Sequence, residues 1–183
     1  MLTKDSKKAE IEEFLKGKGD FVKIDYLNRF LKLFPPIIMR KYAYLKLARI
    51  YLNKSMFVDA AKMFNNAAIN SLTFKEKQEN HLKECKSYIK ALKFENASKA
   101  IKKAFIEANQ KEKRQLYKEM IDYYKKVAND LELQKKSGQA TMVYEKLIRL
   151  NISEEEKQEI KEKLLNSYKK LGKTKEYNFL KSL

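Results

Sequence analysis

At 183 residues the chain is long enough for one domain with a sizeable core. Its 41 Lys and Arg against 24 Asp and Glu give a net charge of +17, which favours an acidic peptide, a nucleic acid or an anionic membrane surface as partner, although a solvated lysine-rich surface would explain the same charge. The single Cys85 excludes an internal disulfide, and no apolar run reaches the length of a membrane span. We therefore expect a cytoplasmic protein that does not span a membrane.

The first segment, residues 4–35, has the apolar spacing of helices. Phe14, Leu27 and Phe30 lie at positions that recur later in the chain, and no segment alternates as a strand would. Pro35 and the proline after it separate this segment from a helix that we expect to begin near Ile37, because proline suits the first turn of a helix.

Residues 41–72 carry the clearest pattern of the chain. Its members are Tyr44, Leu47, Ala48, Tyr51, Ala60 and Phe64. Offset for offset, they resemble the tetratricopeptide repeat, W-x2-L-G-x2-Y followed by A-x3-F. The resemblance implies a helical hairpin that stacks with further copies into a right-handed superhelix and that serves to bind another chain.

Further copies follow in register. If Lys41 is taken as the first residue of the best copy, the next begin at Gln78, Ile121 and Gln158, which gives steps of 37, 43 and 37 residues. The longer step indicates an extra helical turn or two. Residues 4–35, 41–72, 78–109, 121–152 and 158–183 then form five hairpins, of which the first and last are degenerate.

Local signals agree with this division. Thr73 with Glu76, and Ser153 with Glu156, form capping boxes where a new hairpin should begin. All four glycines are expected at turns within hairpins, where a left-handed residue can end a helix. These glycines are Gly17, Gly19, Gly138 and Gly172. The prediction is an all-α solenoid of about ten helices in a single domain that spans residues 1–183.

Residues able to support catalysis are sparse. The chain has one histidine, no phosphate-binding glycine loop, and no cysteine or histidine cluster with metal-ligand spacing. His81 takes the leading aromatic position of its repeat, and Cys85 lies one turn later at a small position where burial would leave a thiol inert. We expect no enzyme activity and no cofactor.

The helix face that lines the groove of tetratricopeptide proteins is basic here. On the first helix of each hairpin, this face contains the residues two, five and nine places after the leading aromatic position of the repeat, which is Tyr44 in residues 41–72. These are Lys46, Arg49, Asn53, Lys83, Lys86, Lys90, Lys126, Asn129, Leu133, Lys163, Asn166 and Lys170. The resemblance implies that such Lys and Arg grip carboxylates and that Asn129 and Asn166 hold a peptide backbone. Lys125, one turn before Asn129, matches the start of a carboxylate clamp whose other positions are missing.

Three hypotheses about the partner remain open at this point. The first is an acidic extended peptide or protein tail in the groove. The second is RNA or the ribosome, because the same lysines could neutralise phosphates. The third is a second copy of the chain, docked on an apolar C-terminal end. That end comprises Tyr177, Phe179, Leu180 and Leu183.

Overall fold

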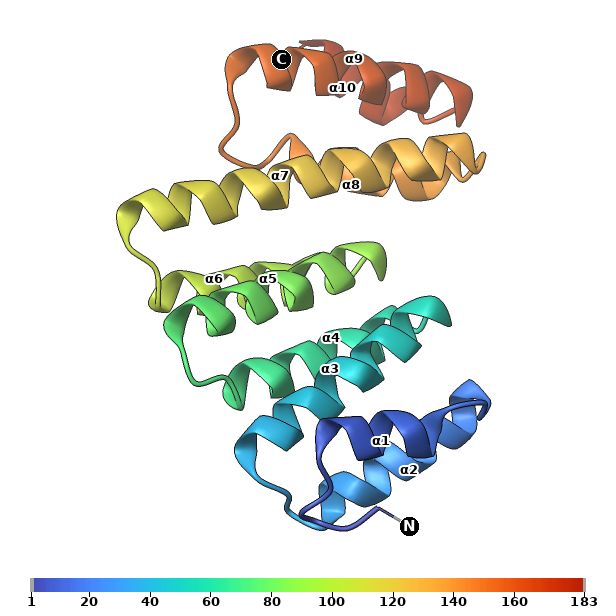
Figure 1. Cartoon of the computed structure of the whole chain (residues 1–183). Coiled ribbons are helices and arrows are strands. Elements are labelled where there is room, and N and C mark those ends of the chain that lie inside the picture. The colour runs from blue at the N-terminus through green and yellow to red at the C-terminus, as the bar shows by residue number, and fades with distance from the viewer. Residues whose placement is uncertain (1, 183) are drawn as a thin grey trace. The chain divides into compact units, whose positions relative to one another are not determined.

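The computed structural model describes residues 2–182, and this part of the chain is all-α (Figure 1). It contains ten helices, which confirms the predicted fold class. Their bounds are α1 Lys8–Leu15, α2 Asp20–Lys32, α3 Ile37–Asn53, α4 Phe57–Ile69, α5 Phe74–Lys90, α6 Phe94–Ile106, α7 Gln110–Leu133, α8 Ser137–Leu147, α9 Glu154–Lys170 and α10 Thr174–Ser182.

The chain divides into two compact units, Met1–Leu116 and Tyr117–Leu183, called unit 1 and unit 2 below. The boundary falls inside α7. In unit 1 the helices pack on their neighbours in chain order, from α2 on α3 through to α5 on α6, and in unit 2 α9 packs on both α8 and α10. Each unit is therefore built from contacts between helices that are adjacent in the sequence.

The turns between the two helices are almost identical in the last four hairpins. Ser55, Leu92, Lys135 and Gly172 all have a left-handed backbone, with φ between 56° and 67°. In each turn the next amide donates to a carbonyl five residues earlier, at 2.9 Å, as in a Schellman motif. These four residues are 37, 43 and 37 positions apart, which are the steps that the repeat pattern predicts.

The longer step comes from α7, which has 24 residues where α3, α5 and α9 have 17. The extra helical turns that the sequence predicts are therefore present. The expectation for Gly138 is wrong, because Gly138 lies inside α8 and the left-handed residue of that turn is Lys135. Gly17 and Gly172 do occupy left-handed turns.

The repeat positions form the core of each unit. In unit 1, Leu47, Ala48, Ala60 and Ala97 are fully buried, and the small side chains allow the paired helices to approach closely. The core of unit 2 likewise contains the buried residues Ala128, Ala140, Val143, Tyr144 and Leu164. The last hairpin is weaker, since α10 contributes no buried residue.

A glutamate in the first turn joins the first helices of successive hairpins. The Thr73 hydroxyl accepts from the Glu76 amide at 3.2 Å, but the Glu76 carboxylate accepts from the Leu72 amide at 3.3 Å, so only half of the predicted capping box is formed. The same carboxylate accepts a hydrogen bond from Lys41 Nζ on α3 at 2.6 Å. In unit 2 the predicted box is complete, and Glu156 accepts from the Ser153 amide at 3.0 Å and from Lys125 Nζ at 2.6 Å.

A third glutamate of this kind, Glu112, lies in the first turn of α7. It accepts from the Asn109 amide at 2.8 Å and from Gln78 Nε2 on α5 at 3.3 Å. We call Glu76, Glu112 and Glu156 the capping glutamates. Each one accepts a hydrogen bond from the backbone amide of a residue just before its own helix and also binds a side chain of the preceding first helix, so the cap and the packing are one interaction.

Two glycines in unit 2 provide a matched test of the turn geometry. A Cβ added at Gly138 or at Gly172 would meet no atom within 4 Å, so only the backbone distinguishes the two sites. Gly172→Ala should lower the free energy of unfolding by about 1 kcal/mol, because φ is +67° there. Gly138→Ala should raise it by about 0.5–1 kcal/mol, because Ala favours a helix. Denaturant unfolding followed by circular dichroism measures both, and equal effects would contradict the assignment.

The capping glutamates also predict a pH dependence. Hydrogen bonds from Lys41 and from Lys125 lower the pKa of Glu76 and of Glu156 below the ordinary value of 4.5. Because the folded pKa is the lower one, the stabilisation is present above pH 4.5 and is lost as the pH falls below that value. Stability should therefore decline on acidification, and less steeply in the Glu76→Gln, Glu156→Gln double variant.

Thermal unfolding between about pH 7 and about pH 3 measures this decline. The control is Glu79→Gln with Glu162→Gln, which removes two exposed carboxylates that make neither kind of contact. A double variant at Glu76 and Glu156 that follows the wild-type curve would show that these two ion pairs do not stabilise the fold.

Candidate functional site

The predicted groove residues lie at equivalent places on the first helices of four hairpins. Lys46, Lys83, Lys126 and Lys163 are related by the same steps as the turns, on α3, α5, α7 and α9 respectively. The positions on α3 and α5 belong to unit 1, and the others belong to unit 2. Each unit thus carries its own basic stripe along two first helices.

Lys46 is not available to a partner as an isolated cation. Its Nζ lies 2.5 Å from Glu12 Oε2 on α1, and the Tyr42 hydroxyl donates to the other oxygen of Glu12. The Lys46 hydrogen bond is the main reason why the pKa of Glu12 is lowered, while burial and this carboxylate raise the pKa of Tyr42. Lys46 therefore ties α3 to α1.

Three of the other basic residues of the stripe in unit 1 face solvent. Arg49, Lys83 and Lys90 are exposed and make no ion pair within residues 2–182, and Lys90 Nζ lies 5.3 Å from the centre of the Phe57 ring. Lys86 is half-buried, and Asn53 is exposed at the end of α3. Because α3 carries no acidic residue, no carboxylate of its own helix offsets the charge of Arg49.

In unit 2 the predicted clamp residue has a structural contact. Lys125 pairs with the capping glutamate Glu156, so it joins α7 to α9 as Lys41 joins α3 to α5. Lys163 pairs with Glu159 at 3.1 Å on its own helix and lies over the Tyr144 ring at 5.7 Å. Neither lysine is an isolated cation.

The remaining members in unit 2 are exposed. Lys126, Asn166 and Lys170 make no side-chain hydrogen bond or ion pair within residues 2–182, and Asn129 accepts a long hydrogen bond of 3.4 Å from the Tyr144 hydroxyl. Leu133 completes the stripe and is strongly exposed. At the C-terminal end Phe179 is exposed and Tyr177 and Leu180 are not buried, whereas Leu183 lies outside the described residues.

A pocket of about 310 Å³ lies beside the stripe of unit 1, where α1, α2 and α3 meet. Its polar side chains include two of the three carboxylates of α1, each already bound by a lysine: Glu12 by Lys46 and Glu13 by Lys16. Lys23, from α2, lines the same pocket and makes no ion pair within residues 2–182. This pocket therefore has an uncompensated cation.

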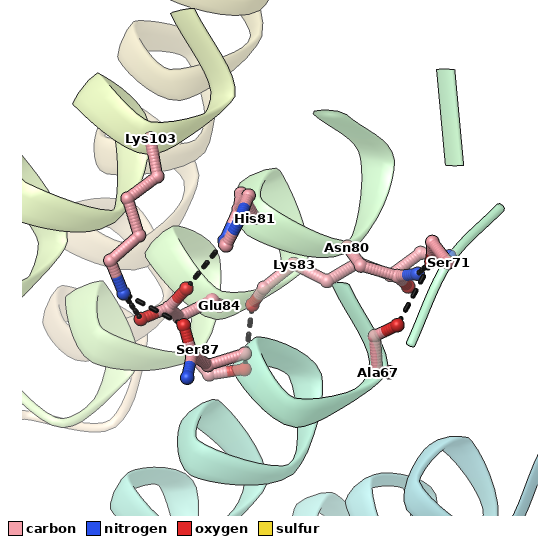
Figure 2. Close-up of polar contacts among 9 residues, drawn as sticks. Ala67, Ser71, Asn80, His81, Lys83, Glu84, Ser87 and Lys103 are labelled. Carbon is pink, nitrogen blue, oxygen red and sulfur yellow. Dashed lines mark hydrogen bonds and ion pairs between the residues drawn. The ribbon is translucent and has the colours of Figure 1, made fainter. Parts of the chain in front are cut away.

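A buried polar cluster occupies the second repeat (Figure 2). Glu84 on α5 is only 2% exposed, although its equivalents Leu47, Val127 and Leu164 are apolar core residues. Figure 2 shows His81 and Lys103 converging on its carboxylate, both at 2.9 Å. Lys103 comes from α6, and its Nζ also donates to Asn65 on α4 at 2.8 Å. Lys103 thus links α6 to both α5 and α4.

The same helix buries further polar groups. Asn80 donates to the Ser71 hydroxyl at 3.0 Å, which in turn donates to the Ala67 carbonyl at 2.9 Å, and Ser87 donates to the Lys83 carbonyl (Figure 2). These groups satisfy one another inside α5 and its neighbours, so they are part of the packing.

The structure argues against any use of Cys85 and His81 together as a nucleophile and its base. Cys85 is fully buried, and this burial raises the pKa of its thiol to about 12, while the His81 Nδ1 atom is engaged by Glu84. Within residues 2–182, no group of three or more His, Cys, Asp or Glu side chains is placed to hold a metal ion. In the same part of the chain, no helix is both long and apolar enough to cross a membrane.

Sequence reasoning placed His81 at the leading aromatic position of its repeat but missed the contacts that Glu84 makes with His81 and with Lys103. The signal was present, because a charged residue at a core position of one repeat calls for an opposite charge on the paired helix. It also missed the box formed by Asn109 and Glu112, because only Ser and Thr were considered as the first residue.

Charge is distributed unevenly between the units. Unit 1 contains 26 Lys and Arg against 13 Asp and Glu, and unit 2 contains 15 against 11. Most of the positive field therefore surrounds unit 1, where the exposed cations of the stripe also lie.

Comparison of the chain with protein-family models, with curated proteins and with solved structures finds no match.

Removal of the Glu84 carboxylate should destabilise unit 1. Glu84→Ala leaves Lys103 and His81 without their shared acceptor, and we expect the free energy of unfolding to fall by about 2–4 kcal/mol. Lys103 is partly exposed and can regain water, so the loss should be smaller than for a fully buried pair. Denaturant unfolding measures the change.

Glu79→Ala is the matched control, because Glu79 is an exposed glutamate on the same helix, and it should change stability by no more than about 0.5 kcal/mol. Glu84→Leu, which restores the residue class of the other repeats, should recover part of the loss. A Glu84→Ala variant as stable as the control would show that the cluster does not support the packing.

Proposed function

We propose that this chain is a non-enzymatic interaction scaffold of the tetratricopeptide type, in which the basic stripe of unit 1 binds an acidic extended segment of another protein. The pattern of residues 41–72, the equivalent turns and the five hairpins support the family. We also propose a cytoplasmic location, on the basis of the single buried thiol.

The observation that carries the proposal is the separation of paired from unpaired charge. Lysines that face other helices, such as Lys41 and Lys46, have carboxylate partners, whereas Arg49, Lys83 and Lys90 have none within residues 2–182. Of the three acids on α5, two are engaged, and Glu79 is exposed and makes no ion pair within residues 2–182. The stripe therefore offers positive charge that the fold does not use.

An extended acidic segment fits this arrangement better than a compact ligand. Lys83, Lys86 and Lys90 follow one face of α5 over two helical turns, and Arg49 occupies the equivalent face of α3. The exposed amide of Asn53 can hydrogen-bond a peptide backbone beside these cations. In unit 2, Lys126, Asn166 and Lys170 supply the same groups for a second length of chain.

Charge reversal of the stripe tests the proposal. Lys83→Glu with Lys90→Glu should weaken binding of a fluorescent peptide rich in Asp and Glu about tenfold or more, since each tenfold loss corresponds to about 1.4 kcal/mol. The binding should also weaken with salt, because exposed charges are screened over about 8 Å at physiological ionic strength. Fluorescence anisotropy measures the dissociation constant.

Lys99→Glu with Lys102→Glu is the matched control, because it makes the same change of net charge on α6 at two exposed lysines without partners. An equal loss of peptide affinity in both double variants would show that binding depends on overall charge, and it would contradict the proposal. A mixed-sequence RNA that binds more tightly than the peptide, and with a steeper dependence on salt, would favour the RNA or ribosome hypothesis instead.

A further inference from the structure

Exposed apolar side chains gather at one edge of unit 1. We define the inter-hairpin edge as residues 32–38, 69–76 and 106–114, which connect α2 to α3, α4 to α5 and α6 to α7. It holds eight of the fifteen large exposed apolar side chains of the described residues. The eight are Leu33, Phe34, Ile37, Ile38, Ile69, Leu72, Phe74 and Ile106.

The three connections lie side by side. Figure 1 shows them on the same side of unit 1, at the left of the view. Two contacts hold the beginnings of the helices together there: Lys41 on α3 binds Glu76 on α5, and Gln78 on α5 binds Glu112 at the beginning of α7. Gln78 Nε2 also donates to the Glu107 carbonyl in the third connection, at 2.5 Å. The apolar side chains therefore form a row across consecutive connections.

Phe34 shows that folding alone does not account for this row. Its side chain is 84% exposed and its φ is +51°, a left-handed conformation that Gly or Asn adopts more easily. A phenylalanine at this position adds little packing and strains the backbone. The exposed ring therefore calls for a contact outside the fold.

The charges of the edge are mainly positive. Its three acids, Glu76, Glu107 and Glu112, are engaged by Lys41, by Lys77 at 3.7 Å and by the cap of α7. Five basic residues of the edge have no ion pair within residues 2–182. These are Lys32, Lys75, Lys111, Lys113 and Arg114. The edge is thus apolar at the tips of its connections and cationic between them.

We propose that the inter-hairpin edge binds the surface of an anionic phospholipid bilayer. The apolar tips, such as Phe34, Phe74 and Ile106, would enter the layer beneath the headgroups, while Lys75 and Lys111 contact lipid phosphates. A second copy of the chain is disfavoured, because it would bring the same unpaired cations face to face. The edge shares no residue with the basic stripe, so this proposal and the proposed function can fail independently.

Vesicle sedimentation tests the proposal with the full chain. The protein should sediment with vesicles in which about a third of the lipid is phosphatidylserine, and much less with phosphatidylcholine alone. Phe34→Asn with Phe74→Ser should lower the partition coefficient about tenfold or more, because insertion depends on apolar area. Lys75→Glu with Lys111→Glu should also lower it, without loss of fold, since acids suit the first turns of α5 and α7.

Two control variants separate the edge from bulk properties. Phe21→Ser with Phe179→Ser removes two phenylalanines that are similarly exposed elsewhere, and Lys99→Glu with Lys102→Glu makes the same charge change away from the edge. Both controls should bind vesicles within about threefold of the wild type. The proposal is overturned if the wild type does not bind anionic vesicles, or if the control variants lose as much vesicle binding as the edge variants. It is also overturned if the edge variants bind vesicles like the wild type and lose only their binding of the acidic peptide.

Discussion

The double use of a first-turn glutamate is the interaction on which the arrangement of this chain depends. Glu76, Glu112 and Glu156 each receive the backbone at the beginning of their own helix and a side chain from the preceding first helix. A cap of this kind sets where a helix starts and which neighbour it lies against at the same time. Hairpins of unequal length, such as that of α7, can follow one another because the contact is made at the start of each helix.

Ion pairs between helices also determine which charged side chains remain available to other molecules. Lys46, as a groove residue, and Lys125, as a clamp residue, were both expected to be available to a partner when only the spacing along a helix was considered. Their partners, Glu12 and Glu156, lie 34 and 31 residues away in the sequence, on a different helix. The helical period places a side chain on a face, but it does not tell whether a neighbouring helix brings an opposite charge to that face.

The fold was predictable where it rests on apolar spacing. Leu47, Ala60 and Tyr144 are core residues of their hairpins, and the steps of 37, 43 and 37 residues recur in the left-handed turns. The turns themselves were less predictable, because packing on both sides imposes a left-handed backbone on Ser55, Leu92 and Lys135 without glycine. Conversely, Gly138 is a helical residue, since tertiary packing overrides a weak local preference.

The buried thiol of Cys85 has a practical consequence. It is the only sulfhydryl of the chain, and it lies fully enclosed in α5 next to the Glu84 cluster that joins α4, α5 and α6. A thiol reagent can reach it only when this part of unit 1 opens, so the labelling rate reports that opening in the native sequence, without an engineered probe. Comparison of this rate with global unfolding would reveal whether the polar middle of unit 1 opens on its own or only together with the apolar hairpins around it.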